Sequence, residues 1–152
     1  MSMFKNVSLD TIIEWLNHFF GDANNTAFIF SPDALTARAK VNRINVAISS
    51  IAQWSDYECG IKERDAEDFK SIIWNSSPLL ESSSVFFISD ESLTSKTGFE
   101  FTLDNFDKFV DYYEDNFNME FFQPSDYIIC MKEERQIRII HHEGVRIVIK
   151  KS

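Results

Sequence analysis

The sequence predicts an α+β fold, in which an antiparallel β-sheet ends in a C-terminal three-strand meander and helices pack on the sheet. Short apolar runs bounded by turn residues, which are typical of strands, gather in the last third of the chain. Two other segments, residues 8–21 and 103–117, carry apolar residues at helical spacing. A chain of 152 residues is the size of one compact domain, so we expect a single domain over residues 1–152.

The first half of the chain is only partly legible. A helix is expected between Ser8, which can cap its N-terminus, and Gly21, which can end it. A short buried strand is expected at residues 26–30, and Ser31-Pro32-Asp33 is a typical helix start. Residues 34–53 fit both a helix and a strand, so their division stays open, and residues 54–84 show no clear pattern.

The second half is clearer. A buried strand is expected at residues 84–89, and a helix is expected from Leu103 to about Phe117, with Thr102 as its N-cap. Three strands, residues 127–132, 136–142 and 145–150, form the meander. Glu143-Gly144 is interpreted as the two-residue turn between the last two strands, which sets His142 opposite Val145.

Charge is unevenly distributed along the chain. The net charge is −9, from 15 basic and 24 acidic residues. This balance argues against a protein whose main task is to bind nucleic acid or anionic lipid, since both need a basic surface. Residues 90–126 alone hold ten acidic residues and two basic ones, whereas residues 127–152 are net basic. The excess of acid is therefore located around one predicted helix.

That helix has two distinct sides. At about 100° per residue, one side is apolar and the opposite side is acidic, interrupted only by Lys108. The stripe is either a solvated face or a docking surface for a cationic partner, because electrostatic complementarity selects partners and speeds association. The candidate partner-binding residues are Asp104, Asp107, Asp111, Glu114 and Asp115.

No motif in the sequence requires catalysis. The most catalytic-looking cluster is His141-His142-Glu143, but neighbouring residues of a strand point to opposite faces, so the two histidines cannot act on one point. No spacing typical of a metal site or of a phosphate-binding loop is present, so we expect no catalytic residues, metal or cofactor. Cys59 and Cys130 are expected to be free thiols, buried among apolar residues. Without a signal-peptide pattern or a long apolar run, a cytoplasmic location is expected.

The second half of the chain also resembles a known family. The segments that carry the resemblance are residues 85–88, 98–101, 105–113, 121–129 and 139–144. Together they resemble bacterial immunity proteins of contact-dependent growth inhibition systems, over about residues 85–150. The resemblance implies a cytoplasmic, non-enzymatic protein that binds and neutralises the C-terminal toxin domain of a large secreted effector. Many such toxins are nucleases, so the implied partner is a basic protein domain rather than nucleic acid or a membrane.

Two alternatives from other classes remain open. The chain can be a non-catalytic regulatory or assembly module, which would bind a different partner. It can also be a small enzyme that uses His142 and Glu143, which would need a pocket around them. The oligomeric state and the identity of the toxin are not readable from the sequence.

Overall fold

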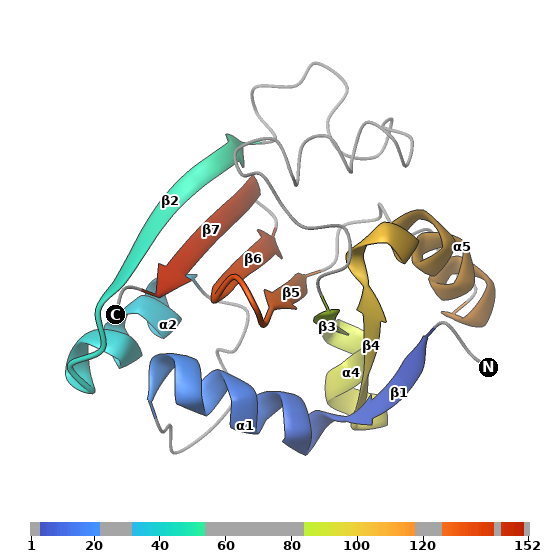
Figure 1. The fold of residues 1–152 in the computed structure, drawn as a ribbon, viewed down its shortest axis with the longest axis horizontal. Helices are drawn as coiled ribbons and strands as arrows, with labels where there is room; N and C mark the ends of the chain where they lie inside the picture. The colour runs from blue at the N-terminus through green and yellow to red at the C-terminus, as the bar shows by residue number, and fades with distance from the viewer. Residues whose placement is uncertain (1–3, 22–31, 54–83, 118–125, 142–143, 151–152) are drawn as a thin grey trace.

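The computed structural model describes residues 4–21, 32–53, 84–117, 126–141 and 144–150. Its framework is one seven-stranded sheet in the order β1-β4-β3-β5-β6-β7-β2, in which every neighbouring pair is antiparallel (Figure 1). The α+β class and the C-terminal meander β5-β6-β7 are therefore confirmed. The strands are β1 (Lys5–Ser8), β2 (Val46–Gln53), β3 (Ser84–Ser89), β4 (Thr97–Thr102), β5 (Tyr127–Met131), β6 (Gln136–His141) and β7 (Gly144–Lys150).

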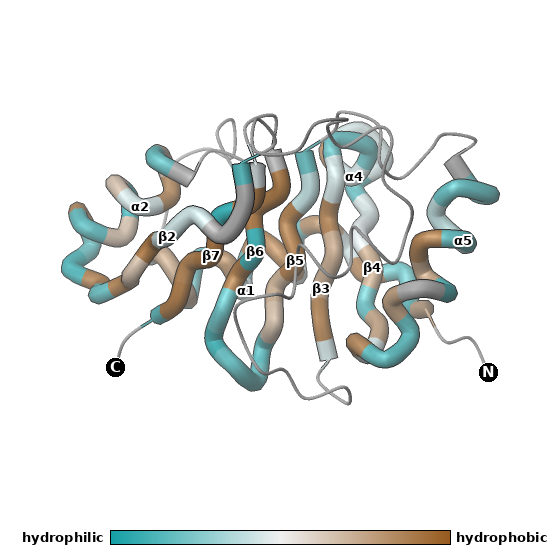
Figure 2. The backbone as a smooth tube through the Cα atoms, turned by 90° about the horizontal axis from the view of Figure 1, so that it is seen from above, coloured by the Kyte–Doolittle hydropathy of each residue, from teal (hydrophilic) through white to brown (hydrophobic). Residues whose placement is uncertain are grey.

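Helices cover both faces of this sheet. The described helices are α1 (Leu9–Phe20), α2 (Pro32–Val41), α4 (Asp90–Ser95) and α5 (Phe106–Phe117), the last preceded by the 3-10 turn η3 (Leu103–Asn105). One core cluster joins α1 and α2 to the sheet, and a second joins α5 to the opposite face. Because both faces are covered, the central strands are apolar along most of their length, as Figure 2 shows for β3 and β5.

The first helix begins and ends where the sequence predicts. The hydroxyl oxygen of Ser8 accepts a hydrogen bond from the amide of Thr11 at 3.2 Å, which satisfies a free donor of the first turn. At the other end, Gly21 has a φ of 88° and donates its amide to the carbonyl of Asn17 at 2.7 Å.

Residues 34–53, left open by the sequence, divide into α2 and β2. The chain leaves α2 in a turn in which Arg43 has a φ of 60° and donates its amide to the carbonyl of Lys40. The strand that follows is the outermost of the sheet and pairs with β7, with Val46 opposite Lys150. A partner about a hundred residues away in sequence decides this strand, so local periodicity does not reveal it.

Three elements were not predicted at all: β1, α4 and β4. β1 is only four residues long, and it pairs with β4 at the far edge of the sheet. In β4, Gly98 and Glu100 interrupt the apolar pattern. Gly98 is needed because α1 passes close to this strand. A Cβ atom there would lie 2.4 Å from Cδ1 of Ile12 and 2.8 Å from the carbonyl oxygen of Phe87.

The predicted turn between the last two strands is wrong by one residue. Gly144 belongs to β7 and lies opposite His141, so Ile140 faces Val145 rather than Ile147. The register therefore slides by two residues, which leaves each side chain on its predicted face because strand residues alternate with a period of two.

Several predictions fall outside the described residues. They are the strand at 26–30, the segment 54–83, and the residues Cys59, His142 and Glu143. Cys130, by contrast, is free and fully buried as predicted, and burial raises the pKa of its thiol well above the ordinary value. No helix in the described ranges is long and apolar enough to cross a membrane.

Candidate protein-docking surface

The segment that leads into α5 differs from its prediction. The helix was expected to start at Leu103 under a Thr102 cap, but residues 103–105 form a 3-10 turn and the α-helix begins at Phe106. The side chain of Thr102 makes no capping bond to the backbone. It donates instead to the carboxylate of Asp104 and accepts from the side-chain amide of Asn105 at 3.0 Å. These side-chain bonds hold Asp104 at the start of the acidic stripe.

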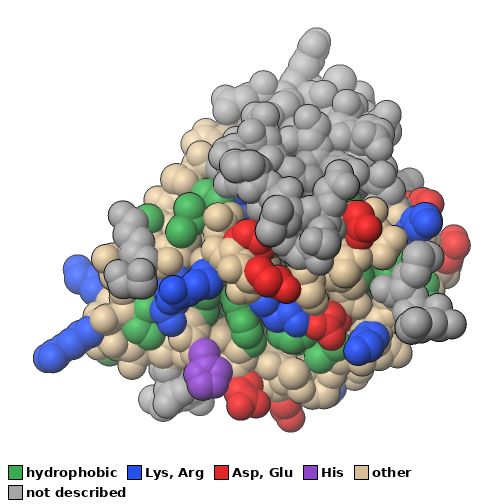
Figure 3. Space-filling model, in the orientation of Figure 1, with side chains coloured by type: hydrophobic (Ala, Val, Ile, Leu, Met, Phe, Trp, Pro, Cys, Tyr) green, Lys and Arg blue, Asp and Glu red, His purple; other side chains and the backbone are tan. Residues whose placement is uncertain are grey.

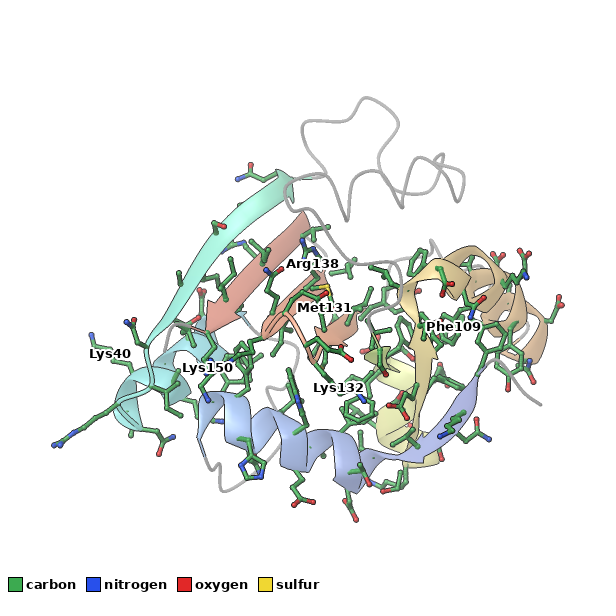
Figure 4. The ribbon with its side chains drawn as sticks, in the orientation of Figure 1. Lys40, Phe109, Met131, Lys132, Arg138 and Lys150 are labelled. Atoms are coloured by element: carbon green, nitrogen blue, oxygen red, sulfur yellow. The ribbon has the colours of Figure 1, made fainter. Side chains whose placement is uncertain are left out.

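The inner face of α5 is embedded in aromatic side chains, and Phe109 is their centre (Figure 4). Its ring stacks on Phe101 with the centroids 4.2 Å apart, and it meets Phe87 edge-on at 4.8 Å. Phe99 and Phe4 make further edge contacts at 5.4 Å and 5.7 Å. Such pairs add stability beyond the area that they bury, so the orientation of the helix is strongly determined.

A buried hydrogen bond reinforces this orientation. The hydroxyl of Tyr113, on the inner face of α5, donates to the hydroxyl oxygen of Ser89 at the end of β3, at 3.0 Å. Both residues are buried. Burial raises the pKa of Tyr113, and the bond to Ser89 only partly offsets this effect. The bond joins α5 to the centre of the sheet and helps to fix which side of the helix faces solvent.

The outer face of α5, together with the turn η3 before it, carries four of the five predicted acidic residues. Asp104, Asp111 and Asp115 are exposed, and Glu114 is half-buried. The side chain of Asp107 lies outside the described part of the molecule. Lys108 is also exposed and is the one basic residue of the helix. We call Asp104, Asp111, Glu114 and Asp115 the acidic face.

Basic side chains project at one end of the molecule, over α2 and the start of β2 (Figure 3). Acidic side chains lie at the end formed by α5, but also at the centre and along the lower rim of this view, and basic side chains accompany them. α2 and the turn after it supply Arg38, Lys40 and Arg43. The basic side chains at the α2 end attract an anionic partner, whereas the acidic side chains on the outer side of α5 attract a cationic one.

A polar cluster that the sequence did not reveal lies on the α1 side of the sheet. Lys132 forms an ion pair with Glu100, and its ammonium lies 4.1 Å from the centre of the Phe86 ring. Ser84 donates to the same carboxylate at 3.1 Å. Burial alone would raise the pKa of Glu100, but Lys132 and Ser84 outweigh it and hold that pKa below its ordinary value. The cluster comes from two neighbouring strands, β3 and β4, and from the turn directly after β5, so only the strand register could have predicted it.

The structure describes little of the residues on which the catalytic alternative depends. His141 is the last residue of β6, and nothing is described of its side chain or of His142 and Glu143. In the described ranges, no group of three His, Cys, Asp or Glu side chains is placed to hold a metal ion. One further charged residue is buried: Arg138 of β6, which donates to Gln136 at 3.0 Å and whose pKa is lowered by burial to about 10.

No protein-family model, curated protein or solved structure matches this chain. The candidate surface is therefore argued from its own geometry and charge.

Proposed function

We propose that this chain is an immunity protein, which binds and neutralises the C-terminal toxin domain of a contact-dependent growth inhibition effector in the cytoplasm. The proposed toxin is a nuclease with a basic substrate groove, and the acidic face of α5 is the proposed contact. The resemblance over residues 85–150 suggested this function. It remains a proposal about the partner and about the mode of inhibition.

One observation carries the proposal: α5 is held rigidly by its inner face while its outer face presents acid. The side chains of Asp111 and Asp115 are exposed and form no hydrogen bond or ion pair with any described residue, so their charge is available to a partner. Like charges spaced three and four residues apart also weaken a helix by a few tenths of a kcal/mol per pair. The presence of these acidic residues despite their cost to the helix suggests that they serve a role other than stability.

The proposed action is binding, not catalysis. A nuclease groove attracts phosphate through Lys and Arg side chains, and carboxylates on a rigid helix offer such side chains an alternative negative surface. The acidic face can therefore compete with the nucleic acid for the groove or dock beside it. The chain itself contacts neither nucleic acid nor membrane in this proposal and needs no cofactor.

The test uses the protein domain encoded at the C-terminal end of the gene immediately upstream. The two proteins are purified together, and the cleavage of RNA and DNA by that domain is measured with and without this chain. We expect a one-to-one complex, loss of cleavage, and an association rate that falls as salt rises.

Charge reversal locates the contact. The double variant Asp104→Lys and Asp111→Lys should slow association several-fold. The matched control is Asp10→Lys with Glu14→Lys on α1, which makes the same change in net charge at two exposed positions. Each pair also includes one acid in the first turn of a helix, so each variant loses one favourable interaction with a helix N-terminus. The control should leave the association rate within about twofold, because it alters only the long-range field.

The outcomes test the docking site and the immunity function separately. A complex whose association is equally fast in both double variants would overturn the acidic face as the docking site. No complex and no loss of cleavage would overturn the immunity function and favour a regulatory or assembly module.

A further inference from the structure

The two edges of the sheet are protected to different degrees. β1, at one edge, is only four residues long and carries the exposed side chains of Lys5 and Asn6. β2, at the other edge, has eight residues with the sequence VAISSIAQ, which contains neither a charged residue nor proline. Short length, charge, proline and bulges are among the devices that stop an edge strand from pairing with another chain, and β2 lacks the first three.

The open side of β2 is continuous over its first five residues. β7 pairs with one side of the strand, and no described strand lies beyond the other (Figures 1 and 2). A bulge after Ser50 shifts the register with β7, so the regular edge runs from Val46 to Ser50. Val46, Ala47 and Ile48 are apolar and yet only half-buried. An additional strand would cover this surface and satisfy the outward backbone groups.

Basic side chains surround this edge. Lys40 and Arg43 are exposed at the turn that enters β2, and Lys40 points away from the molecule in Figure 4. Val41, between them, is 81% exposed and offers an apolar contact. Arg146 of β7 lies opposite Ser50 and shares its face of the sheet. Since Ser50 is small and exposed, the long side chain of Arg146 can extend over it towards the open edge.

These cations have no counterpart within the described residues. The side chains of Lys40, Arg43 and Arg146 make no hydrogen bond or ion pair with any of them. Lys150, opposite Val46, contributes a further positive charge beside the strand, and its ammonium bonds the carbonyl of His18 at 2.7 Å. A chain of net charge −9 thus has basic side chains around the β2 edge, which no described strand covers.

We propose that the β2 edge, residues 46–50, binds an extended acidic segment of another protein, which adds to the sheet as an eighth strand. Backbone hydrogen bonds provide the affinity, and the basic rim formed by Lys40, Arg43 and Arg146 selects acidic side chains. This surface lies at the opposite end of the sheet from α5. It goes beyond the proposed function and does not depend on it.

The test uses capped peptides of about eight residues, the length of an ordinary strand. In one peptide Val alternates with Glu, in a second Val alternates with Lys, and a third repeats the first with alternate backbone amides methylated. Binding to the full chain is measured by fluorescence anisotropy, and the site is located by hydrogen exchange. The Glu peptide should bind and slow exchange within residues 46–50. The Lys peptide and the methylated peptide should bind at least about tenfold more weakly.

Two variants test the rim without disturbing the strand. Arg43→Asn removes a charge at a position with positive φ, which Asn tolerates better than Arg, so folding should not suffer. Arg146→Glu reverses the charge beside Ser50. Together they should weaken the Glu peptide about tenfold, the effect of two exposed charge contacts, and improve binding of the Lys peptide. Lys5→Glu on β1 is the matched control and should change neither affinity.

Several results would overturn the proposal. They are equal binding of the Glu and Lys peptides, unchanged binding of the methylated peptide, protection at β1 instead of β2, or a dimer of this chain that pairs through β2. The Asp104→Lys, Asp111→Lys variant should bind the Glu peptide like the wild type. Failure of this proposal is thereby distinguished from failure of the immunity function, which is measured with the toxin domain.

Discussion

α1 and α5 are the same length, twelve residues, and pack on opposite faces of the same sheet. Both bury one side completely. Their solvent sides differ: α1 presents a mixture that includes Asp10, Glu14 and His18, whereas α5 presents acid with Lys108 as its one base. Packing against the sheet demands only the buried side, so it does not explain the acid. The acidic composition of the outer face of α5 is therefore not required by the packing of this helix.

The buried sides differ too. α1 packs mainly through aliphatic side chains such as Ile12 and Leu16, and its close approach to the sheet depends on Gly98. α5 packs through the rings around Phe109 and through the bond from Tyr113 to Ser89. Each helix thus has a single position at which its packing can be tested.

The largest expected effect is on the α5 side. Phe109→Ala should lower the free energy of unfolding by about 3–5 kcal/mol, since it removes a fully buried ring at the centre of the cluster. Urea denaturation followed by circular dichroism measures this loss. A loss below about 1 kcal/mol, within the range of ordinary surface substitutions, would contradict the packing described for α5.

The corresponding test on the α1 side is Gly98→Ala. The added methyl group would overlap the end of the Ile12 side chain and the backbone of β3, so the side chain of Ile12 and the pairing of β3 with β4 must adjust. We expect a loss of about 1–3 kcal/mol in the same denaturation experiment. Combining it with Ile12→Val, which removes the methyl group that Gly98 approaches, should recover part of the loss. No recovery would show that the contact between α1 and β4 is not the cause.

Substitutions on the solvent sides of α5 and α1 should have a smaller effect, and they should raise the free energy of unfolding. Asp111 has Asp107 and Asp115 four residues away, so Asp111→Lys turns two repulsions into attractions. It should stabilise the protein by about 0.5–1 kcal/mol at low salt and less at high salt. Glu14→Lys on α1 should gain at most about 0.3 kcal/mol, because only Asp10 is an acid at that spacing. Equal gains in stability for Asp111→Lys and Glu14→Lys would contradict the difference in surface charge between α5 and α1.

The smallest effect concerns the ion pair on the α1 side. The pKa of Glu100 lies below its ordinary value of 4.5, so the ionised carboxylate stabilises the fold above that pH. This contribution is lost as the pH falls through the lower pKa of the folded state. At neutral pH the free energy of unfolding of the wild type should exceed that of Lys132→Met by about 0.2–1 kcal/mol. This difference should become smaller below about pH 4. Glu100→Gln provides the control background, since the stability difference between Glu100→Gln and the double variant Glu100→Gln, Lys132→Met should not vary with pH there.

Sequence reasoning succeeded where a structure depends on nearby residues. The bounds of α1 follow from Ser8 and Gly21, and the buried side of α5 follows from helical spacing. It failed where a partner is distant in sequence. β1 and β4 stabilise each other across about ninety residues, and β2 exists because β7 pairs with it. The start of α5 was misplaced because Thr102 bonds to the side chains of Asp104 and Asn105 rather than to the backbone.

The sequence by itself determined the class of the fold, the meander and the acidic side of one helix, because hydrophobic periodicity and charge are local properties of the chain. Only the tertiary structure decided the strand order and the register. It also decided which edge of the sheet stays unprotected and where the basic residues gather. Arg146 lies about a hundred residues from Lys40 and Arg43 along the chain and joins them in one rim only because β2 and β7 are neighbours in the sheet. Such juxtapositions depend on long-range pairing, which no short stretch of sequence encodes.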